Sequence, residues 1–303
     1  EVTGSDDQIL EPSRSRLNQA GLLPSADGWF PANISKELDV VILGMHARTD
    51  NPELLAAQAM GISVQSYPEF LFHATQDKNR VVIGGSHGKT TVTSMALHVL
   101  NRLGREVDFM VGAQLDGFDR MVSLTDNREW AIFEGDEYLS SPIDRRPKFF
   151  WYRPHITLLT GIAWDHINVF PSEEDYLQQF EQYLTTVEPN GVVVFCEEDP
   201  KLSELVSKAQ GIQPIAYRTP HWIRKGKGVE LRFADGGSCF TSLVGTHNYQ
   251  NLAGARALCC AMGISGQKFD GAIQDFTGAA RRLEAIETSE DATVYRDFAH
   301  APS

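Results

Sequence analysis

The chain has 303 residues, of which 42% are hydrophobic, and this length suits about two domains with packed cores. Its formal net charge of −13 at pH 7 comes with no long basic cluster, so we expect neither a nucleic-acid surface nor binding to an anionic membrane. No apolar run is long enough to span a bilayer. The four cysteines show no C-x-x-C spacing, and we expect reduced core residues of a cytoplasmic protein: Cys196, Cys239, Cys259 and Cys260.

Residues 1–77 alternate short apolar runs with helical patterns. The run 38–44 is typical of a buried parallel strand, a helix opens near Pro52, and residues 61–64 are expected to form a second strand. Residues 1–7 have the pattern of a strand end and a turn. These features predict a small Rossmann-like α/β domain that lacks its first strand, with the polar segment 76–80 as its boundary.

The stretch 81–91 has the pattern of a phosphate-binding loop. Three β-branched residues, Val81, Val82 and Ile83, lead into a glycine-rich loop, and an amphipathic helix follows at once. In such a loop the backbone N–H groups and the helix N-terminus bind the anion. We expect an ATP- or GTP-binding loop formed by Gly85, Ser86, His87, Gly88, Lys89, Thr90 and Thr91.

The loop departs from the usual P-loop, because isoleucine stands at position 83 where the pattern has glycine. The alternative is a tight strand-to-helix turn that happens to contain Lys89 and Thr90. In the phosphate-binding reading, Lys89 reaches the terminal phosphates and the Thr90 hydroxyl ligates Mg²⁺. We expect Lys89 to be a solvated loop residue whose replacement leaves the fold intact.

Acidic and histidine side chains follow two later strands. Residues 130–133 form a predicted strand that ends in Glu134-Gly135-Asp136-Glu137, where a doubly wound sheet places metal ligands. Glu134 is therefore a candidate partner of Thr90 at Mg²⁺, and the alternative is a solvated acidic turn. Asp165-His166 follows the next predicted strand, so His166 is either structural or a second-metal or phosphate ligand.

The remaining pattern predicts a helix over 173–185, a strand over 191–196, a β-hairpin within 218–246 and a helix over 252–262. The last helix is preceded by His247-Asn248-x-x-Asn251. The amides of Asn248 and Asn251 share one helix face and can both donate to and accept from an adenine edge, or they serve as a helix cap.

These motifs occur in an order that resembles the Mur ligases, ATP-dependent amide-forming enzymes of peptidoglycan assembly, over essentially the whole chain. The resemblance implies a UDP-sugar-binding Rossmann-like domain at 1–77 and a P-loop ATPase domain with a mostly parallel sheet at 78–285. Residues 286–303 would hold the first strand of a third α/β domain, and both ends of the chain fall within elements. We therefore expect a fragment of a longer protein.

The resemblance also implies roles for single residues. Lys89, Glu134 and His166 would be catalytic, with Thr90 and Glu134 on one Mg²⁺ and His166 on a second. The nucleotide would be bound by the P-loop together with Asn248, Asn251, Arg282 and Asp297. The UDP sugar would meet Ser5, Asp6 and His46. Some family members carry a carbamoylated lysine after the Asp-His motif; residues 178–181 contain no lysine, and we expect no such modification.

Within the family, Tyr138 and the Arg-Pro-rich stretch 144–154 are similar to the branch that joins UDP-N-acetylmuramate to L-alanyl-γ-D-glutamyl-meso-diaminopimelate. Gly135 and Leu139 depart from the usual pattern. The resemblance implies ATP and Mg²⁺ as cofactors and an acyl-phosphate route. The alternatives are L-alanine as the acceptor, or a P-loop nucleotide-binding module without ligase activity.

Overall fold

The computed structural model describes residues 2–112, 118, 120–167 and 169–278, and the backbone of two strands at 284–288 and 293–296. Helices and mostly parallel strands alternate along it, which confirms the predicted α/β class. The chain divides into two compact units, Glu1–Phe70 with Leu139–Arg146 and Leu71–Tyr138 with Pro147–Ser303. The assignment of a UDP-sugar domain, an ATP domain and a third domain to 1–77, 78–285 and 286–303 stays a prediction.

The first unit contains few regular elements: α1 (Ser13–Gln19), η1 (Pro31–Asn33), β1 (Val41–Leu43), α2 (Pro52–Met60), β2 (Val64–Ser66) and the start of α3 (Tyr67–His73). β1 and β2 pair in parallel, with Val41 opposite Val64. Helix α2 begins as expected, because the Asn51 side chain accepts hydrogen bonds from the N–H groups of Glu53 and Leu54.

The strands of this unit differ from the prediction. The run 38–44 forms a strand only over Val41–Leu43, and Ile42 is exposed, so this segment is not the fully buried strand that its composition indicated. The second strand lies at Val64–Ser66 instead of 61–64. Where a strand end was expected in residues 1–7, the described residues show only an isolated bridge between Asp6 and Gly28.

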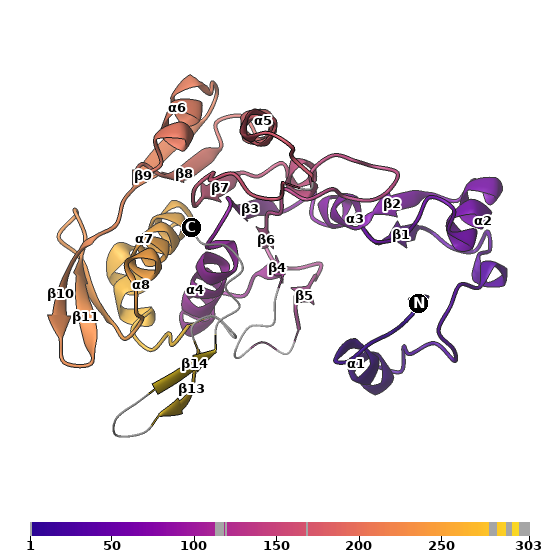
Figure 1. The fold of residues 1–303 in the computed structure, drawn as a ribbon, viewed down its shortest axis with the longest axis horizontal. Helices are drawn as coiled ribbons and strands as arrows, with labels where there is room; N and C mark the ends of the chain where they lie inside the picture. Colours follow the sequence, from indigo (N-terminus) through magenta and orange to yellow (C-terminus); the bar gives the residue numbers. More distant parts are fainter. Residues whose placement is uncertain are drawn as a thin grey trace. The chain divides into compact units, whose positions relative to one another are not determined.

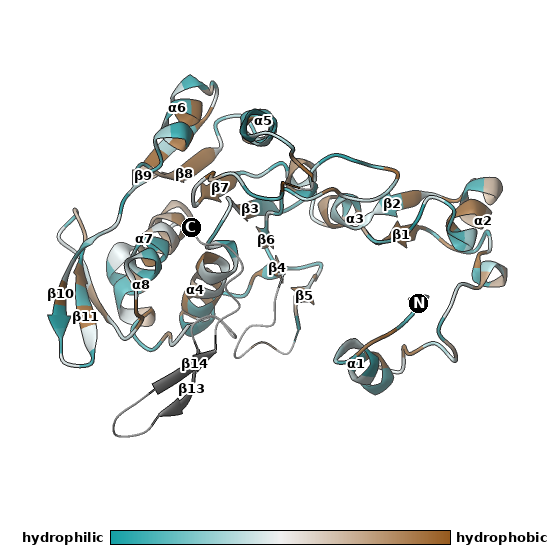
Figure 2. Cartoon of the chain, in the orientation of Figure 1, coloured by the Kyte–Doolittle hydropathy of each residue, from teal (hydrophilic) through white to brown (hydrophobic). Residues whose placement is uncertain are grey.

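The second unit is built on a seven-stranded sheet of order β5-β4-β6-β3-β7-β8-β9. Its strands are β3 (Asn79–Gly84), β4 (Asp108–Met110), β5 (Val122–Ser123), β6 (Trp130–Glu134), β7 (Ile156–Leu159), β8 (Val192–Cys196) and β9 (Gln213–Tyr217). All neighbouring pairs are parallel except β4 and β5. The central strands are apolar on both faces, as expected for a parallel sheet covered by helices (Figure 2).

Helices cover both faces of this sheet. On one face α4 (Lys89–Arg102), α7 (Thr246–Ala261) and α8 (Gly266–Ala272) contact one another and share a core with alternate residues of β3, β6 and β7 (Figure 1). On the other face lie η2 (Lys148–Tyr152) and α5 (Glu173–Leu184), where Phe149 stacks on Tyr183 at 4.2 Å. Helix α6 (Pro200–Lys208) contacts α5 and β8.

A three-stranded antiparallel sheet lies between β9 and α7, where the sequence predicted a hairpin. It consists of β10 (His221–Lys225), β11 (Gly228–Arg232) and β12 (Ser238–Thr241). The first turn is tight, with Lys225 paired to Gly228 and Gly226 at φ +59°. Further along, β13 (Glu284–Thr288) and β14 (Thr293–Arg296) form an antiparallel pair.

The polar segment 76–80, expected to be a boundary, lies within the second unit, and only its first residues, Gln76 and Asp77, are exposed. Lys78 and Arg80 are buried, and Arg80 donates to the carbonyl oxygens of Thr75 and Tyr152 at 2.9 and 2.8 Å. These side chains satisfy backbone groups that would otherwise be buried without partners.

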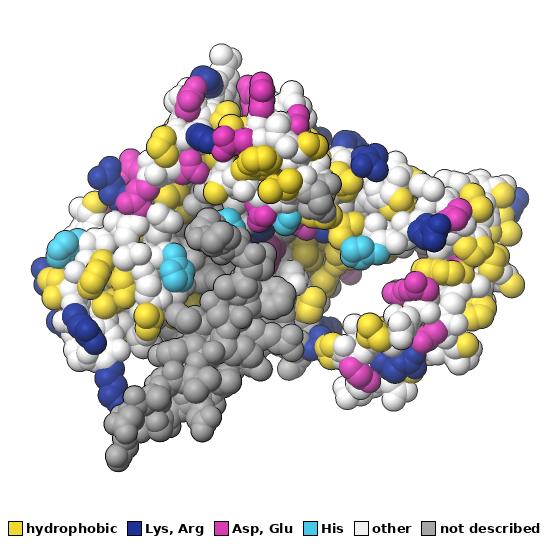
Figure 3. Space-filling model, in the orientation of Figure 1, with side chains coloured by type: hydrophobic (Ala, Val, Ile, Leu, Met, Phe, Trp, Pro, Cys, Tyr) yellow, Lys and Arg dark blue, Asp and Glu magenta, His cyan; other side chains and the backbone are white. Residues whose placement is uncertain are grey.

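On the surface, Lys and Arg side chains are interspersed with Asp and Glu over the described part of the face in Figure 3.

Three of the four cysteines, Cys196, Cys239 and Cys259, are buried and unbridged, as expected. The expectation is wrong for Cys260, which follows Cys259 on α7 and is exposed. Consecutive residues of a helix point about 100° apart, so only one of the two can face the sheet.

Candidate active site

The register of the parallel sheet brings the predicted motifs to one edge. Ile83 pairs with Glu134 on β6, and Gly84 pairs with Leu159 on β7. The glycine loop after β3, the acidic segment after β6 and Asp165-His166 after β7 therefore all follow carboxyl ends of adjacent strands. Open α/β sheets bind their ligands at this edge.

The loop itself is held by the segment that follows β7. The Ser86 N–H donates to Gly161 O at 2.9 Å, and the Thr160 hydroxyl donates to His87 O. Gly85 has φ +117°, and a Cβ there would overlap the Thr160 hydroxyl, so this position requires glycine. Gly88 has φ +85°, and a Cβ there would overlap the side-chain oxygen of Asn251 on α7.

Lys89 is not the solvated loop lysine that the sequence indicated. Its Nζ donates to Glu137 Oε2 at 2.9 Å and to Gly85 O at 2.7 Å, and its side chain is 13% exposed. Burial opposes its charge, but Glu137, with Asp136 and Glu134 nearby, raises the pKa of Lys89. Glu137 is fully buried, and although burial opposes ionisation, Lys89 and His166 lower the pKa of Glu137 to about 2.

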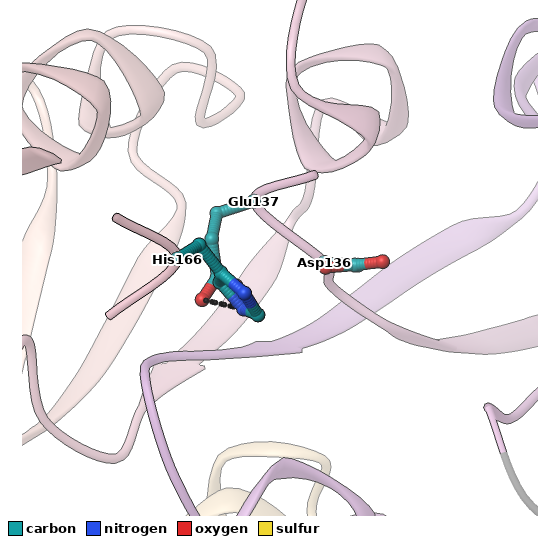
Figure 4. A group of neighbouring side chains, drawn as sticks. All are labelled: Asp136, Glu137 and His166. Atoms are coloured by element: carbon teal, nitrogen blue, oxygen red, sulfur yellow. Dashed lines mark ion pairs between the residues drawn. The ribbon is translucent and has the colours of Figure 1, made fainter. Parts of the chain in front are cut away.

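Glu137 has two further partners. The Tyr176 hydroxyl donates to Glu137 Oε1 at 2.9 Å, and His166 Nε2 lies 3.4 Å from the same oxygen. The hydrogen bond to Glu137, opposed by burial, raises the pKa of His166. Figure 4 shows Glu137 and His166 facing each other, with Asp136 pointing aside, where Lys148 Nζ binds it at 2.7 Å.

The metal ligands predicted from the sequence fall into two adjoining groups. Thr90 Oγ1 donates to Glu134 Oε1 at 2.8 Å, so these two side chains are together. His166 lies instead with Glu137 and Asp136, and single ligand atoms of these three are all within 4.8 Å of one another. Glu137 lies within the acidic run that the sequence singled out, but it received no role there.

The other predicted nucleotide residues are placed differently. Asn251 is buried beside Gly88, whereas Asn248 is half-buried and donates to Val244 O at 2.7 Å. His87 Nε2 lies 3.7 Å from Asp165 Oδ2, and Thr91 is buried within α4. Contact of the two asparagines with adenine stays a prediction. Arg282 and Asp297 lie outside the described residues.

The predicted UDP-sugar residues lie in the first unit. Ser5 Oγ donates to Glu53 Oε1 at 2.8 Å, and Asp6 accepts the Gly28 N–H through its backbone oxygen at 2.7 Å. Burial and the neighbouring Asp7 raise the pKa of Asp6. His46 lies exposed in the turn after β1. Their role stays a prediction.

The fold and the loop define a nucleotide-type α/β domain with a variant P-loop. Residues 83–259 match the Mur ligase middle domain. This match covers more than half of the chain, which therefore belongs to the Mur ligase family.

The chain is similar to two named relatives over its whole length. It is 28% identical to the UDP-N-acetylmuramate–L-alanyl-γ-D-glutamyl-meso-2,6-diaminoheptandioate ligase of Escherichia coli K12 and spans 68% of that protein. It is 29% identical to the UDP-N-acetylmuramate–L-alanine ligase of Arthrobacter sp. FB24 and spans 64% of it.

The fold is similar to a crystal structure of the UDP-N-acetylmuramate:L-alanyl-γ-D-glutamyl-meso-diaminopimelate ligase from Neisseria meningitides. The TM-score is 0.83 at 24% identity, with 93% of this chain and 92% of the other covered. Among the described residues, no helix has the length and apolar character needed to cross a membrane.

Proposed function

We propose that this chain is the nucleotide-binding part of an ATP-dependent amide ligase that extends UDP-N-acetylmuramate. Members of the Mur ligase family are ATP-dependent ligases, and both relatives above are named as UDP-N-acetylmuramate ligases. The observation that carries the proposal is the buried pair of Lys89 and Glu137 beside the glycine loop. Removing two charges from water costs nearly as much free energy as their attraction returns, so a buried ion pair adds little net stability. An ion pair buried beside a candidate anion-binding loop therefore favours a role in binding.

The residues present fit a nucleotide phosphate and Mg²⁺. The glycine loop and the N-terminus of α4 offer backbone N–H groups to an anion. The hydroxyl of Thr90 and the carboxylates of Glu134 and Glu137 are the oxygen ligands that Mg²⁺ prefers. Thr90 and Glu134 would hold one ion, and Glu137 with His166 would hold a second.

In this proposal the protein contributes alignment and charge. Bound ATP would supply the phosphoryl group that activates the muramate carboxylate as an acyl phosphate, with Mg²⁺ offsetting phosphate charge. Lys89 stays protonated at neutral pH, because Glu137 raises its pKa, and it offers its ammonium to the terminal phosphates. Thr160 holds the loop through His87 O, so the backbone N–H groups keep their orientation.

We propose the tripeptide L-alanyl-γ-D-glutamyl-meso-diaminopimelate as the acceptor. The two relatives, one named for the tripeptide and one for L-alanine, are almost equally similar to the chain and do not separate the acceptors. Support comes from Tyr138 and the stretch 144–154, which are similar to the branch of the family that joins the tripeptide. A cytoplasmic location is part of the proposal, since ATP and UDP-sugars are cytoplasmic metabolites and the four cysteines are unbridged.

Phosphate release by the full-length protein tests this function. With ATP, Mg²⁺ and UDP-N-acetylmuramate, we expect release on addition of the tripeptide and much less with L-alanine. Release with L-alanine alone would move the protein to the other branch. Nucleotide binding without amide formation from either acceptor would leave only a P-loop binding module.

A further inference from the structure

The hydroxyl group of Tyr176 lies inside the candidate site. Tyr176 belongs to α5, a helix that contains none of the sequence motifs. It lies in the first part of α5, on the face of the sheet opposite α4, and its side chain is fully buried. Its ring packs edge to face on Phe170 and Phe180, with centroids 5.4 and 5.2 Å away. The ring therefore supports the hydrophobic core, while the hydroxyl meets polar groups.

The hydroxyl joins two parts of the site. It donates to Glu137 Oε1 at 2.9 Å and lies 3.0 Å from Ser86 Oγ in the glycine loop. Ser86 Oγ in turn donates to Ala163 O at 2.6 Å. The chain Ala163–Ser86–Tyr176–Glu137 thus connects the loop to the carboxylate that binds Lys89.

The number of hydroxyl hydrogens decides which group donates at each contact of this hydrogen-bonded series. It has three contacts, but only Ser86 and Tyr176 carry a hydrogen to donate, because a carbonyl and an ionised carboxylate only accept. A donor is bound most strongly by a charged acceptor, so the Tyr176 hydrogen goes to Glu137. A phenol is neutral at neutral pH and therefore carries this hydrogen. The Ser86 hydrogen goes to Ala163 O at 2.6 Å, and Ser86 Oγ lies against the Tyr176 hydroxyl at 3.0 Å.

We propose that Tyr176 is a positioning residue, whose hydroxyl fixes Glu137 in the orientation that receives Lys89 and couples this carboxylate to Ser86. The inference rests on the proposed function, in which Glu137 would also hold Mg²⁺. Groups that hydrogen-bond a metal ligand orient it, and their loss typically weakens metal affinity or activity by about 10- to 100-fold.

The variant Tyr176→Phe tests the proposal, because it removes the hydroxyl and keeps the ring. Tyr183→Phe is the matched control. Tyr183 lies on the same helix, is also fully buried, and its hydroxyl bonds Thr157 Oγ1 at 2.8 Å in place of Glu137. Each variant loses a buried hydrogen bond. The Tm of the full-length protein should fall further for Tyr176→Phe, because its hydroxyl binds a charged carboxylate.

The discriminating measurement is binding of a fluorescent ATP analogue over a series of Mg²⁺ concentrations and in EDTA. For Tyr176→Phe we expect the Mg²⁺ concentration at half-maximal binding to rise about tenfold, with affinity in EDTA within about twofold of the parent. Tyr183→Phe should match the parent in both. Ser86→Ala should shift the Mg²⁺ requirement in the same direction by less, and it serves as the test if Tyr176→Phe does not fold.

The outcomes separate the two proposals. If the parent protein binds no ATP analogue, the proposed function and this inference both fail. If the parent binds with Mg²⁺ but Tyr176→Phe behaves like Tyr183→Phe, only the positioning role is overturned. Equal losses with Mg²⁺ and in EDTA would also overturn it, because they would show a general loosening of the loop.

Discussion

Glu137 is an ionised carboxylate without solvent contact, and it is stable only because donors surround it. Lys89 and Tyr176 donate to its two oxygens, and His166 lies close to one of them. Removing one partner of such a group leaves charge unpaired in a low-dielectric site, which costs more than the contact itself is worth. Substitutions around Glu137 should therefore affect folding as well as binding.

Lys89→Ala should abolish ATP-dependent phosphate release and lower the free energy of unfolding by about 3 kcal/mol at pH 7, since it leaves Glu137 unpaired. The loss should shrink at pH 5, where Glu137 without its ammonium partner can bind a proton and become neutral. Urea unfolding at both pH values measures this. Lys148→Ala is the control, because Lys148 pairs with the half-exposed Asp136, and such a pair is worth under about 1 kcal/mol. Equal losses for the two lysines would contradict the buried-pair interpretation.

His166 gives a pH dependence of the opposite sign to that of an ordinary carboxylate. Its folded-state pKa is raised above the ordinary 6.5, mainly by hydrogen bonding to Glu137. Its contribution is therefore complete below about pH 6.5 and is lost as pH rises through the raised pKa; for a partly exposed pair it should be under about 1 kcal/mol. The difference in unfolding free energy between the parent and His166→Gln, measured from pH 5.5 to 8.5, should fall with rising pH. A difference that grows with pH would be inconsistent with this pairing.

At the scale of elements, the sequence predicted the features that depend on neighbouring residues, such as where a helix or strand begins. The β-branched run before the glycine loop forms β3, the amphipathic pattern after the loop forms α4, and α2 begins at Pro52 as expected. Prediction was poorer where tertiary contacts decide. The contact of Tyr176 with Glu137 spans 39 positions in the sequence, and nothing in the helical pattern around Tyr176 marks it.

The same limit applies to the charged residues. Lys78 and Arg80 resemble a solvated boundary in sequence, but they are buried because carbonyl groups of distant segments surround them. Thr90, at the start of α4, and Glu134, at the end of β6, lie together because β3 and β6 are parallel neighbours. Alternating strand and helix patterns in a sequence do indicate such an arrangement. His166, predicted at a second ion, follows β7 with φ +56° and lies beside Glu137, a residue to which the sequence assigned no role.

Gly85→Ala should disrupt the loop as an element. Its φ of +117° is unfavourable for alanine, and the added Cβ would displace Thr160, so we expect a loss of about 1 to 3 kcal/mol in stability and weaker ATP binding. Gly104→Ala is the matched control at the end of α4, with φ +66° and open space around the added atom. It should cost about 1 kcal/mol and leave ATP affinity unchanged. Unaltered ATP affinity in Gly85→Ala would show that the loop does not bind phosphate.

At the scale of the whole molecule, the candidate site is contained in one unit. The glycine loop, Glu134, Glu137, His166 and Tyr176 all belong to Leu71–Tyr138 with Pro147–Ser303. The three predicted UDP-sugar residues belong to the other unit. The two proposed binding functions therefore map onto separately packed parts of the chain, and a ligand of one site should stabilise its own unit.

Binding of ATP with Mg²⁺ should raise the thermal unfolding transition of the second unit. A ligand that binds only the folded state at 100 times its Kd adds about 2.7 kcal/mol, which for a unit of this size raises Tm by roughly 5 to 10 °C. The shift should be much smaller in EDTA, because Glu134 and Glu137 then meet phosphate charge without a cation between them. Calorimetry of the full-length protein with ATP, with or without Mg²⁺, measures both effects, and Lys89→Ala should remove most of the shift. An equal shift in EDTA would place the nucleotide away from these carboxylates, and no shift at saturating ATP and Mg²⁺ would contradict nucleotide binding at this site.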